Sequence, residues 1–180
     1  MNKVVVGFCG KLASGKTTLS QVLAKKLDFQ MISFGDFVRN YTSAKGFDSS
    51  SRETLQYFGE KLISQWGYEG FCNKVLEGVD LNEIKGVVID GIRHKEIYFN
   101  LRDLYRDKFL FVFIDVDESL RLNRMSKRDI SPQGQNIILE QHSTEIQVEE
   151  LKAYSNLTIN NSESLDDNIV KLINFINERD

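Results

Sequence analysis

The sequence predicts an α/β fold in which a five-stranded parallel sheet carries helices on both faces. Short apolar runs alternate along the chain with segments of helical periodicity, which is the pattern of β-α-β units. A glycine-rich loop joins the first apolar run to the first helical segment. The chain has 180 residues, a length that suits one compact domain, residues 1–180, rather than two.

The order of the elements follows from these patterns. Strands are expected at Val4–Cys9, Gln30–Ser33, Gly86–Asp90, Phe109–Val116 and Leu157–Asn160. Helices are expected at Thr17–Leu27, Phe37–Ala44, Arg52–Trp66, Phe71–Leu76, His94–Tyr105, Glu118–Arg128 and Asn136–Tyr154, with a terminal helix whose apolar stripe includes Leu165, Ile169, Leu172, Ile173 and Ile176. The helical stretch at residues 36–80 lies between two strands and is long enough to form a substrate-binding insertion.

Composition and charge exclude several classes of partner. The net charge is −3 at pH 7, so an extended surface for nucleic acid or for an anionic membrane is not expected. Cys9 and Cys72 lack the spacing of a disulfide framework or a zinc site and are expected to be reduced core thiols. Neither a signal peptide nor a membrane-spanning apolar run is found, which favours a cytoplasmic location. The oligomeric state is left open.

The segment from Gly10 to Thr17 reads Gly-Lys-Leu-Ala-Ser-Gly-Lys-Thr. With this spacing, backbone N–H groups point inward and the glycines adopt positive φ angles without a Cβ penalty. Lys16 can reach the outer phosphates of a nucleotide, and the Thr17 hydroxyl is placed to bind Mg²⁺. The sequence therefore predicts a nucleoside triphosphate site. The expected loop contacts are Gly10, Leu12, Ala13, Ser14, Gly15, Lys16, Thr17 and Thr18.

Two polar clusters follow predicted strands and should lie at the same rim as the loop. After the second strand, Asp36 is expected in the first turn of a helix, facing the triphosphate, with Arg39 one turn later. The alternative is a carboxylate that favours the helix start and a solvated arginine. After the third strand, Asp90 can hold Mg²⁺ directly or through water, and Arg93 can reach a bound phosphate. An ordinary strand-end turn is the alternative there.

A third cluster lies on the helix after the fourth strand. Arg121, Arg124 and Arg128 share one face of that helix, with Lys127 beside them. Several guanidinium groups in one place can neutralise charge on a phosphoryl group during transfer. The alternatives are a solvated face or, more weakly, a nucleic-acid patch.

A fourth cluster lies within the insertion. Arg52 and Gln56 are four residues apart and therefore share one helix face, with Phe58 and Trp66 nearby in sequence. A cation, an amide and aromatic rings suit a nucleotide-like acceptor, with its phosphate on the arginine and its base on the ring and amide. An amphipathic helix with a polar outer face is the alternative.

With these residues in hand, the sequence resembles the nucleoside monophosphate kinase group of P-loop kinases over nearly its full length. Ile32–Arg39, which includes Phe34, resembles the Ile-Ser-x-Gly-Asp-x-x-Arg signature of adenylate kinases. Arg52–Gly59 is similar to the Arg-x-x-Leu-Gln-x-x-Gly stretch of phage-type deoxynucleotide monophosphate kinases. The Asp90-Gly91-Ile92-Arg93 segment and the tail around Asn160-Asn161 are similar to a branch related to dephospho-CoA kinase.

This resemblance implies a mobile acceptor-binding lobe at residues 36–80 and a lid at residues 121–140. It places Phe34, Arg39, Arg52, Gln56 and Arg93 at the acceptor, with Arg121 over the ATP base, and it implies that Arg124 or Arg128 clamps the transferred group. Relatives often carry an Arg-Asp pair in the helix after the lid, where this chain has Gln141-His142. In that case the basic residues of the third cluster must neutralise the charge of the transferred phosphoryl group without this pair, or catalysis is weak.

The function expected from these residues is phosphoryl transfer from ATP, with Mg²⁺, to a small phosphorylated acceptor, a nucleoside or deoxynucleoside monophosphate. The expected catalytic residues are Lys16, Asp36, Arg93, Arg124 and Arg128. A hydroxyl acceptor, as in dephospho-CoA, is the first alternative, and Asp36 would then be a general base unless it binds Mg²⁺ instead. A regulatory protein that binds ATP without transfer is the second. A guanine-nucleotide switch is disfavoured because the chain has no Asn-Lys-x-Asp motif.

Overall fold

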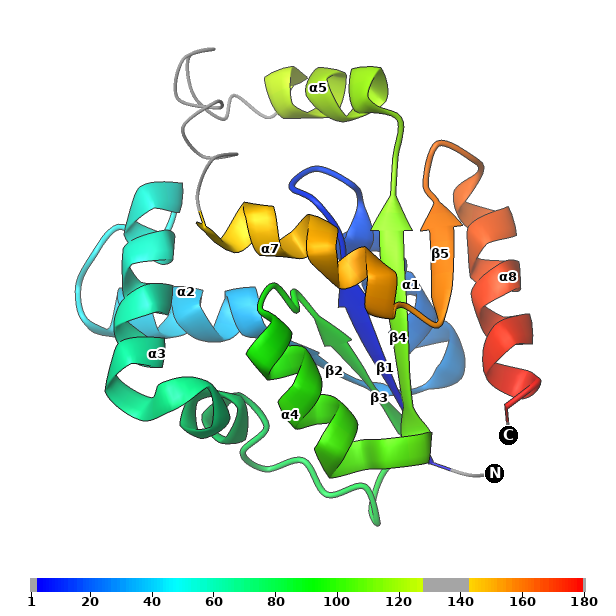
Figure 1. Ribbon diagram of the computed structural model, residues 1–180, viewed down its shortest axis with the longest axis horizontal. Coiled ribbons are helices and arrows are strands. Elements are labelled where there is room, and N and C mark those ends of the chain that lie inside the picture. The colour runs from blue at the N-terminus through cyan, green and yellow to red at the C-terminus, as the bar shows by residue number, and fades with distance from the viewer. Residues whose placement is uncertain (1–2, 128–142, 180) are drawn as a thin grey trace.

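A computed structural model describes residues 3–127 and 143–179 (Figure 1). Five strands form one sheet in the order β2-β3-β1-β4-β5, and every neighbouring pair is parallel. The strands are β1 (Val4–Cys9), β2 (Gln30–Ser33), β3 (Gly86–Asp90), β4 (Phe109–Asp115) and β5 (Leu157–Asn160). The predicted fold class is confirmed. β1 lies at the centre, where Val6 is in register with Val88 of β3 and Leu110 of β4.

Helices cover both faces of this sheet (Figure 1). The α-helices are α1 (Lys16–Leu27), α2 (Phe34–Ala44), α3 (Arg52–Val75), α4 (Lys95–Tyr105), α5 (Glu118–Lys127), α7 (Ser143–Leu151) and α8 (Leu165–Asn177). Two short 3₁₀ helices, η1 (Arg106–Lys108) and η2 (Lys152–Tyr154), precede β4 and β5. None of the described helices is both long and apolar enough to cross a bilayer.

The alternation of side chains along β1 produces two hydrophobic cores. Val6 and Phe8 face one core, in which α1 and the terminal helix α8 pack on the sheet through residues such as Leu19 and Leu172. Val5 and Cys9 face the other core, which α2, α3, α4 and α7 cover. Because successive strand residues point to opposite faces, a strand covered on both sides is apolar throughout. The apolar stripe predicted for the terminal helix is confirmed for Ile169, Leu172 and Ile176, which are buried in the same core, and for Ile173, which is partly buried against it. Leu165, the first residue of α8, is exposed instead.

The two cysteines lie in the second of these cores. Cys9 and Cys72 are 0% and 2% exposed and form no disulfide, as expected from the sequence. Burial raises the pKa of the Cys72 thiol to about 11. The Sγ atom of Cys9 lies 4.0 Å from the carbonyl oxygen of Val148 in α7, so this thiol packs between β1 and the helix above it.

The insertion between β2 and β3 differs from the expectation at two places. α2 begins at Phe34, three residues earlier than predicted, because the Ser33 hydroxyl caps it by accepting a 3.1 Å hydrogen bond from the Asp36 amide. The two helices predicted within residues 52–76 form one element, α3. This element breaks at Gly67, where φ is 68° and ψ is 171°.

The chain after β4 is described in part. β4 ends at Asp115, one residue before the predicted end, where the Asp115 carboxylate accepts a 3.0 Å hydrogen bond from the Val116 amide. The helix predicted at Asn136–Tyr154 corresponds, in its described part, to α7 and η2. Arg128, Gln141, His142 and the lid positions after residue 127 lie outside the described residues.

Candidate active site

The loop between β1 and α1, residues 10–15, emerges from the middle of the sheet at the carboxyl ends of the strands. Gly10 and Gly15 have φ angles of 151° and 86°, and Ala13 has a φ of 62°. A Cβ atom on Gly10 would lie 2.5 Å from the carbonyl oxygen of Ile114, so a side chain does not fit there. The backbone thus has the strained, glycine-dependent shape that the spacing of the segment predicts.

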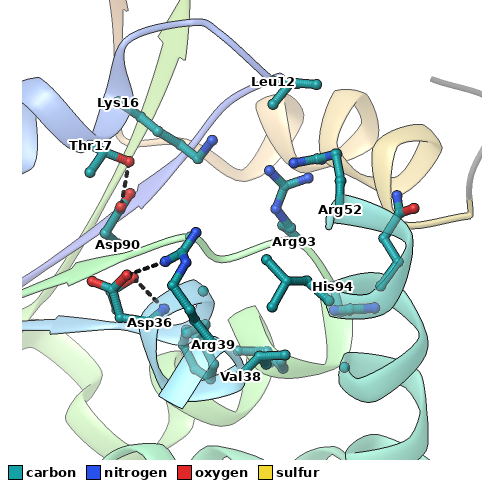
Figure 2. Close-up of a pocket in the computed structure, with 18 of the residues that line it drawn as sticks. Leu12, Lys16, Thr17, Asp36, Val38, Arg39, Arg52, Asp90, Arg93 and His94 are labelled. Carbon is teal, nitrogen blue, oxygen red and sulfur yellow. Dashed lines mark hydrogen bonds and ion pairs between the residues drawn. The ribbon is translucent and has the colours of Figure 1, made fainter. Parts of the chain in front are cut away.

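Lys16 and Thr17, the predicted phosphate and Mg²⁺ ligands, are the first two residues of α1. Lys16 is the first helical residue, and its buried side chain points into the space beside the loop (Figure 2). The first turn of α1 contains no acidic residue, so the positive end of the helix dipole remains available to an anion.

Thr17 and Asp90 form a polar pair below Lys16. The Thr17 hydroxyl donates a 2.7 Å hydrogen bond to Oδ2 of Asp90, which is 4% exposed at the end of β3. The other carboxylate oxygen, Oδ1, is buried and has no hydrogen-bond partner among the described residues. Hydroxyl and carboxylate oxygens are the ligands that Mg²⁺ prefers, and an unsatisfied buried oxygen is what such an ion would satisfy. These two residues therefore fit the predicted cation.

A cavity of about 440 Å³ opens beside the loop, in the size range of small-molecule sites. The phosphate loop, α2, α3 and the segment after β3 supply its walls. Figure 2 shows the Lys16 ammonium and the guanidinium groups of Arg39 and Arg93 pointing into the same space. Arg52 from α3 also lines the cavity. The structure thus brings together cations from four separate segments of the chain.

Asp36 and Arg39, which both line this cavity, form an ion pair. Nη1 of Arg39 lies 2.5 Å from Oδ1 of Asp36, one helical turn away, and both side chains are about half exposed. The predicted phosphate-holding residue and the predicted base or Mg²⁺ ligand are therefore paired with each other in this structure. This contact uses one guanidinium nitrogen and one carboxylate oxygen, so Arg39 retains N–H donors for a second anion.

The α3 wall combines an amide with apolar side chains. Gln56 lines the cavity, and its Nε2 atom is buried without a hydrogen-bond partner among the described residues. The cavity is also lined by the phenylalanine rings of Phe71 in α3 and Phe34 in α2, whose centroids lie 5.6 Å apart. This differs from the expectation for Phe58, which is buried in the core because it lies two residues from Gln56 and so on the opposite side of the helix.

The second expected ring also lies elsewhere. Trp66 packs against Phe37 and Tyr41 of α2, with ring centroids 6.4 Å and 6.1 Å away. It does not line the cavity. The expectation that Phe58 and Trp66 lie at the acceptor is therefore wrong for this cavity, whose phenylalanine rings are those of Phe34 and Phe71.

The arginines of α5 contact the loop backbone instead of the cavity. The Arg121 guanidinium is 3% exposed, pairs with Glu118 at 2.5 Å and donates to the Leu12 carbonyl oxygen at 3.5 Å. The hydrogen bond from Arg121 holds the pKa of Glu118 below its usual value. Arg124 donates to the carbonyl oxygens of Ser14, at 3.3 Å, and Asn161, at 3.0 Å. Neither arginine lines the cavity.

Two further residues reach the site, and sequence patterns alone do not assign them to it. His94 lines the cavity, and its ring centroid lies 5.3 Å from that of Tyr68. Asn161, just after β5, donates a 2.7 Å hydrogen bond from Nδ2 to the Ser14 carbonyl oxygen. Its signal in the sequence is a polar residue directly after a strand, at the rim where the loop lies.

Proteins with similar sequences include several kinases. The chain is 25% identical over 174 residues to the UPF0200/UPF0201 protein of Archaeoglobus fulgidus, covering 93% of this chain and 53% of that protein. It is 29% identical over 167 residues to uridine-cytidine kinase A of Dictyostelium discoideum, covering 79% and 32%. The chain thus spans about half and about a third of these two relatives. Dephospho-CoA kinase of Fusobacterium nucleatum is 26% identical over 200 aligned positions, covering 97% and 98%.

Solved structures share the fold. Shikimate kinase from Aquifex aeolicus superimposes with a TM-score of 0.60 at 14% identity, covering 97% of both chains. Shikimate kinase from Acinetobacter baumannii in complex with shikimate gives a TM-score of 0.60 at 18% identity, covering 98% of this chain and 94% of that one. The fold is therefore that of the P-loop kinases. Since the AAA domain family (AAA_18) matches residues 6–150, from the central strand to α7, the chain belongs to that family.

Proposed function

We propose that this protein transfers a phosphoryl group from ATP, in the presence of Mg²⁺, to a small phosphorylated acceptor, a nucleoside or deoxynucleoside monophosphate. The observation that carries the proposal is the shared cavity, in which Lys16 of the phosphate loop faces Arg39, Arg52 and Arg93 from three other segments. One such cavity suits two anions that must be brought together, because each needs cations and transfer requires that they touch.

The phosphate loop and α1 would hold the donor. The N–H groups of the loop and the start of α1 favour the phosphate chain, and Lys16 adds a point charge at the transferred group. Thr17 and Asp90 would hold Mg²⁺, which neutralises charge on the outer phosphates when bound. The proposed contacts to ATP are Gly10, Leu12, Ala13, Ser14, Gly15, Lys16, Thr17 and Thr18.

The insertion at residues 36–80 would hold the acceptor. Arg39 and Arg93 would grip its phosphate, while Arg52, Gln56 and the ring of Phe34 would contact its other end. A phosphate acceptor is already ionised at neutral pH and needs no general base, so positioning and charge neutralisation suffice. The ion pair between Asp36 and Arg39 supports this role, because a carboxylate keeps the arginine in place until an acceptor phosphate replaces it.

The arginines after β4 fit their predicted contacts, with the ATP base and with the transferred group, less directly. Arg121 is buried against the loop tip, so a place over the ATP base requires the base to approach the guanidinium beside Leu12. Arg124 would have to exchange two carbonyl oxygens for the transferred group. We therefore assign the charge of the transferred group first to Lys16 and Arg93. Arg128 and the lid at residues 121–140 remain part of the proposal.

A hydroxyl acceptor is the second candidate function. The position of Asp36 at the cavity favours it, since a carboxylate there can take the proton of an attacking hydroxyl. The relative from Fusobacterium nucleatum, a dephospho-CoA kinase that matches over nearly its full length, also supports this alternative. To act as the general base, the Asp36 carboxylate would first have to separate from the Arg39 guanidinium.

A panel of acceptors tests the proposal. ADP release from ATP is followed with each common ribo- and deoxyribonucleoside monophosphate and with dephospho-CoA, and we expect slow basal hydrolysis to rise strongly with one monophosphate. The Asp36→Asn variant then separates the two functions. It should lower turnover about 100-fold or more with a hydroxyl acceptor, but by less than about tenfold with a phosphate acceptor.

The control variant for this test is Asp28→Asn. Asp28 is an exposed aspartate that pairs with Lys85 at 2.8 Å, outside the cavity, and its replacement should leave turnover unchanged. If ATP binds but no acceptor in the panel accelerates ADP release, the transfer proposal fails and an ATP-binding regulator is favoured.

A further inference from the structure

Three side chains from outside the phosphate loop donate hydrogen bonds to its carbonyl oxygens. Arg121 donates to Leu12, while Arg124 and Asn161 both donate to Ser14. The bond from Nδ2 of Asn161 is the shortest of the three, at 2.7 Å, and it links residues 147 positions apart in the chain. Asn161 lies in the turn between β5 and α8, far from the acceptor-binding insertion in sequence.

These contacts fix the direction of the loop amides. A trans peptide is planar, so its C=O and its N–H point in opposite directions. When a donor outside the loop holds the Ser14 carbonyl, the N–H of Gly15 is turned to the opposite side. Gly15 lines the cavity but Asn161 does not, so the side opposite Asn161 is the cavity side, on which a phosphate would lie.

Asn161 is itself held on several sides. Its backbone N–H donates a 2.8 Å hydrogen bond to the carbonyl oxygen of Asp115 at the end of β4. Its side-chain oxygen accepts a 3.4 Å hydrogen bond from Nδ2 of Asn168, which is 0% exposed in α8. With the amide oxygen facing Asn168, the amide nitrogen is directed at Ser14. The donor is therefore set in position before any ligand arrives.

The fit between this amide and the loop also explains why Gly15 is a glycine. A Cβ atom on Gly15 would lie 2.2 Å from Nδ2 of Asn161, nearer than any side chain allows. The amide occupies the space that a side chain at residue 15 would need. The second glycine of the motif is thus required by Asn161 as well as by its φ angle of 86°.

We propose that Asn161 is a positioning residue of the nucleotide site, whose amide holds the Ser14–Gly15 peptide so that the Gly15 N–H is presented to the phosphates. The proposal rests on the proposed function, because it takes a nucleoside polyphosphate as the ligand of the loop. It assigns to Asn161 a share of the affinity for ATP and ADP, and none of the affinity for the acceptor.

The first test compares Asn161→Leu with Asn160→Ala by calorimetric titration of ATP and ADP with Mg²⁺. Leucine keeps the branched shape but cannot donate, and we expect roughly tenfold weaker binding of both nucleotides with an unchanged KM for the acceptor. Asn160 is the exposed neighbour at the end of β5, where its side chain accepts only from the Ser162 amide among the described residues. Asn160→Ala should bind both nucleotides as the unaltered protein does.

The second test observes the Gly15 amide directly. Ser14-Gly15 is the only Ser-Gly step in the sequence, so labelling serine with ¹³C at the carbonyl and glycine with ¹⁵N selects a single amide resonance. We expect this resonance to shift when ADP is added to the unaltered protein, and to shift less in Asn161→Leu. The resonance reports on one amide of the folded protein, whereas a calorimetric affinity would also fall if the variant were partly unfolded.

The outcomes separate the two proposals. If the unaltered protein binds neither ATP nor ADP, the proposed function fails and this inference fails with it. If it binds both but Asn161→Leu binds them equally well, the inference alone is overturned. If Asn161→Leu does not fold, the unaltered protein still decides: a Gly15 resonance that stays in place at saturating ADP overturns the inference, and one that moves supports it.

Discussion

The Thr17 hydroxyl and the Asp90 carboxylate, 73 residues apart in the chain, are joined by a 2.7 Å hydrogen bond. The pair links the first turn of α1 to the end of β3, at the edge of the cavity that both residues line. Register explains the contact, because Asp90 lies opposite Phe8 of β1, which leads directly into the phosphate loop. The second oxygen of Asp90 is the buried acceptor that makes this pair suited to a divalent cation.

Replacement of Asp90 by asparagine should abolish most of the dependence of nucleotide binding on Mg²⁺. The amide keeps the size of the side chain but removes its charge, so we expect at least about tenfold weaker binding of ATP in the presence of Mg²⁺ and little change in its absence. Titration of ATP at several Mg²⁺ concentrations measures the effect. Asp80→Asn, an exposed site in the segment before β3, serves as the control. An Asp90→Asn variant with the normal Mg²⁺ dependence would remove Asp90 from the cation site.

Two glycines in α3 should respond oppositely to alanine. Neither Gly59 nor Gly67 has a heavy atom within 4 Å of an added Cβ, so packing does not distinguish them. Gly59 lies in regular helix, and alanine there should raise the free energy of unfolding by about 0.5–1 kcal/mol. Gly67 has a φ of 68° and a ψ of 171°, a conformation almost restricted to glycine, so alanine should lower it by about 1–3 kcal/mol. Urea unfolding of both variants measures these changes. Equal changes in the free energy of unfolding would contradict the helix break at Gly67.

The ion pair between Glu118 and Arg121 should contribute a pH-dependent share of stability. The hydrogen bond from Arg121 lowers the pKa of Glu118, so in acid the unfolded chain binds a proton more readily than the folded one. The contribution is therefore present above the usual glutamate pKa of about 4.3 and is lost as the pH falls through the lower, folded value. We expect the free energy of unfolding to fall more steeply between pH 5 and pH 3 in the unaltered protein than in Glu118→Gln.

At pH 7 the same variant should be destabilised by about 1 kcal/mol, because Arg121 is buried while Glu118 is largely exposed to screening solvent. Glu77→Gln is a matched control, since Glu77 forms an exposed pair with Lys74 at 3.2 Å and the same spacing. Its replacement should change stability by less than about 0.5 kcal/mol. Parallel pH profiles for the unaltered protein and Glu118→Gln would show that this ion pair contributes nothing.

The two thiols should be unreactive in the folded protein. Cys9 and Cys72 are buried, and the raised pKa of Cys72, about 11, leaves little thiolate at pH 8. An aromatic disulfide reagent at pH 8 should therefore release almost no coloured thiol from the folded chain, and two equivalents in urea. A thiol that reacts within seconds in native buffer would place that cysteine at the surface.

Much of the fold could be predicted because its strands are local features of the sequence. Four of the five strands have the predicted bounds, since each is a short run of continuous or alternating apolar residues that ends at a loop or a polar residue. The helical insertion was harder to divide. The segment between the predicted helices Arg52–Trp66 and Phe71–Leu76 contains Gly67 and Gly70, but only Gly67 takes a non-helical conformation, and composition does not distinguish them.

The candidate site was predictable where a residue lies at the carboxyl end of a strand or shortly after it. Asp36, Asp90 and Arg93 all line the cavity, as does Thr17 at the start of the helix after the loop, because the carboxyl ends of parallel strands meet at one edge. The α5 arginines show the limit of this reasoning. Helical spacing places Arg121 and Arg124 on one face, but whether that face meets the cavity or the loop carbonyls depends on how the helix is docked, which spacing does not contain.

The position of β1 has a consequence for how this protein is made. β1 pairs with β3 and β4, which begin at Gly86 and Phe109, and Ser14 takes its shortest side-chain hydrogen bond from Asn161. A chain synthesised from its N-terminus therefore carries the complete glycine motif long before the partners that shape it have been translated. A nascent chain should therefore bind nucleotide weakly until β3, β4 and Asn161 have emerged from the ribosome and can pack against β1 and the loop.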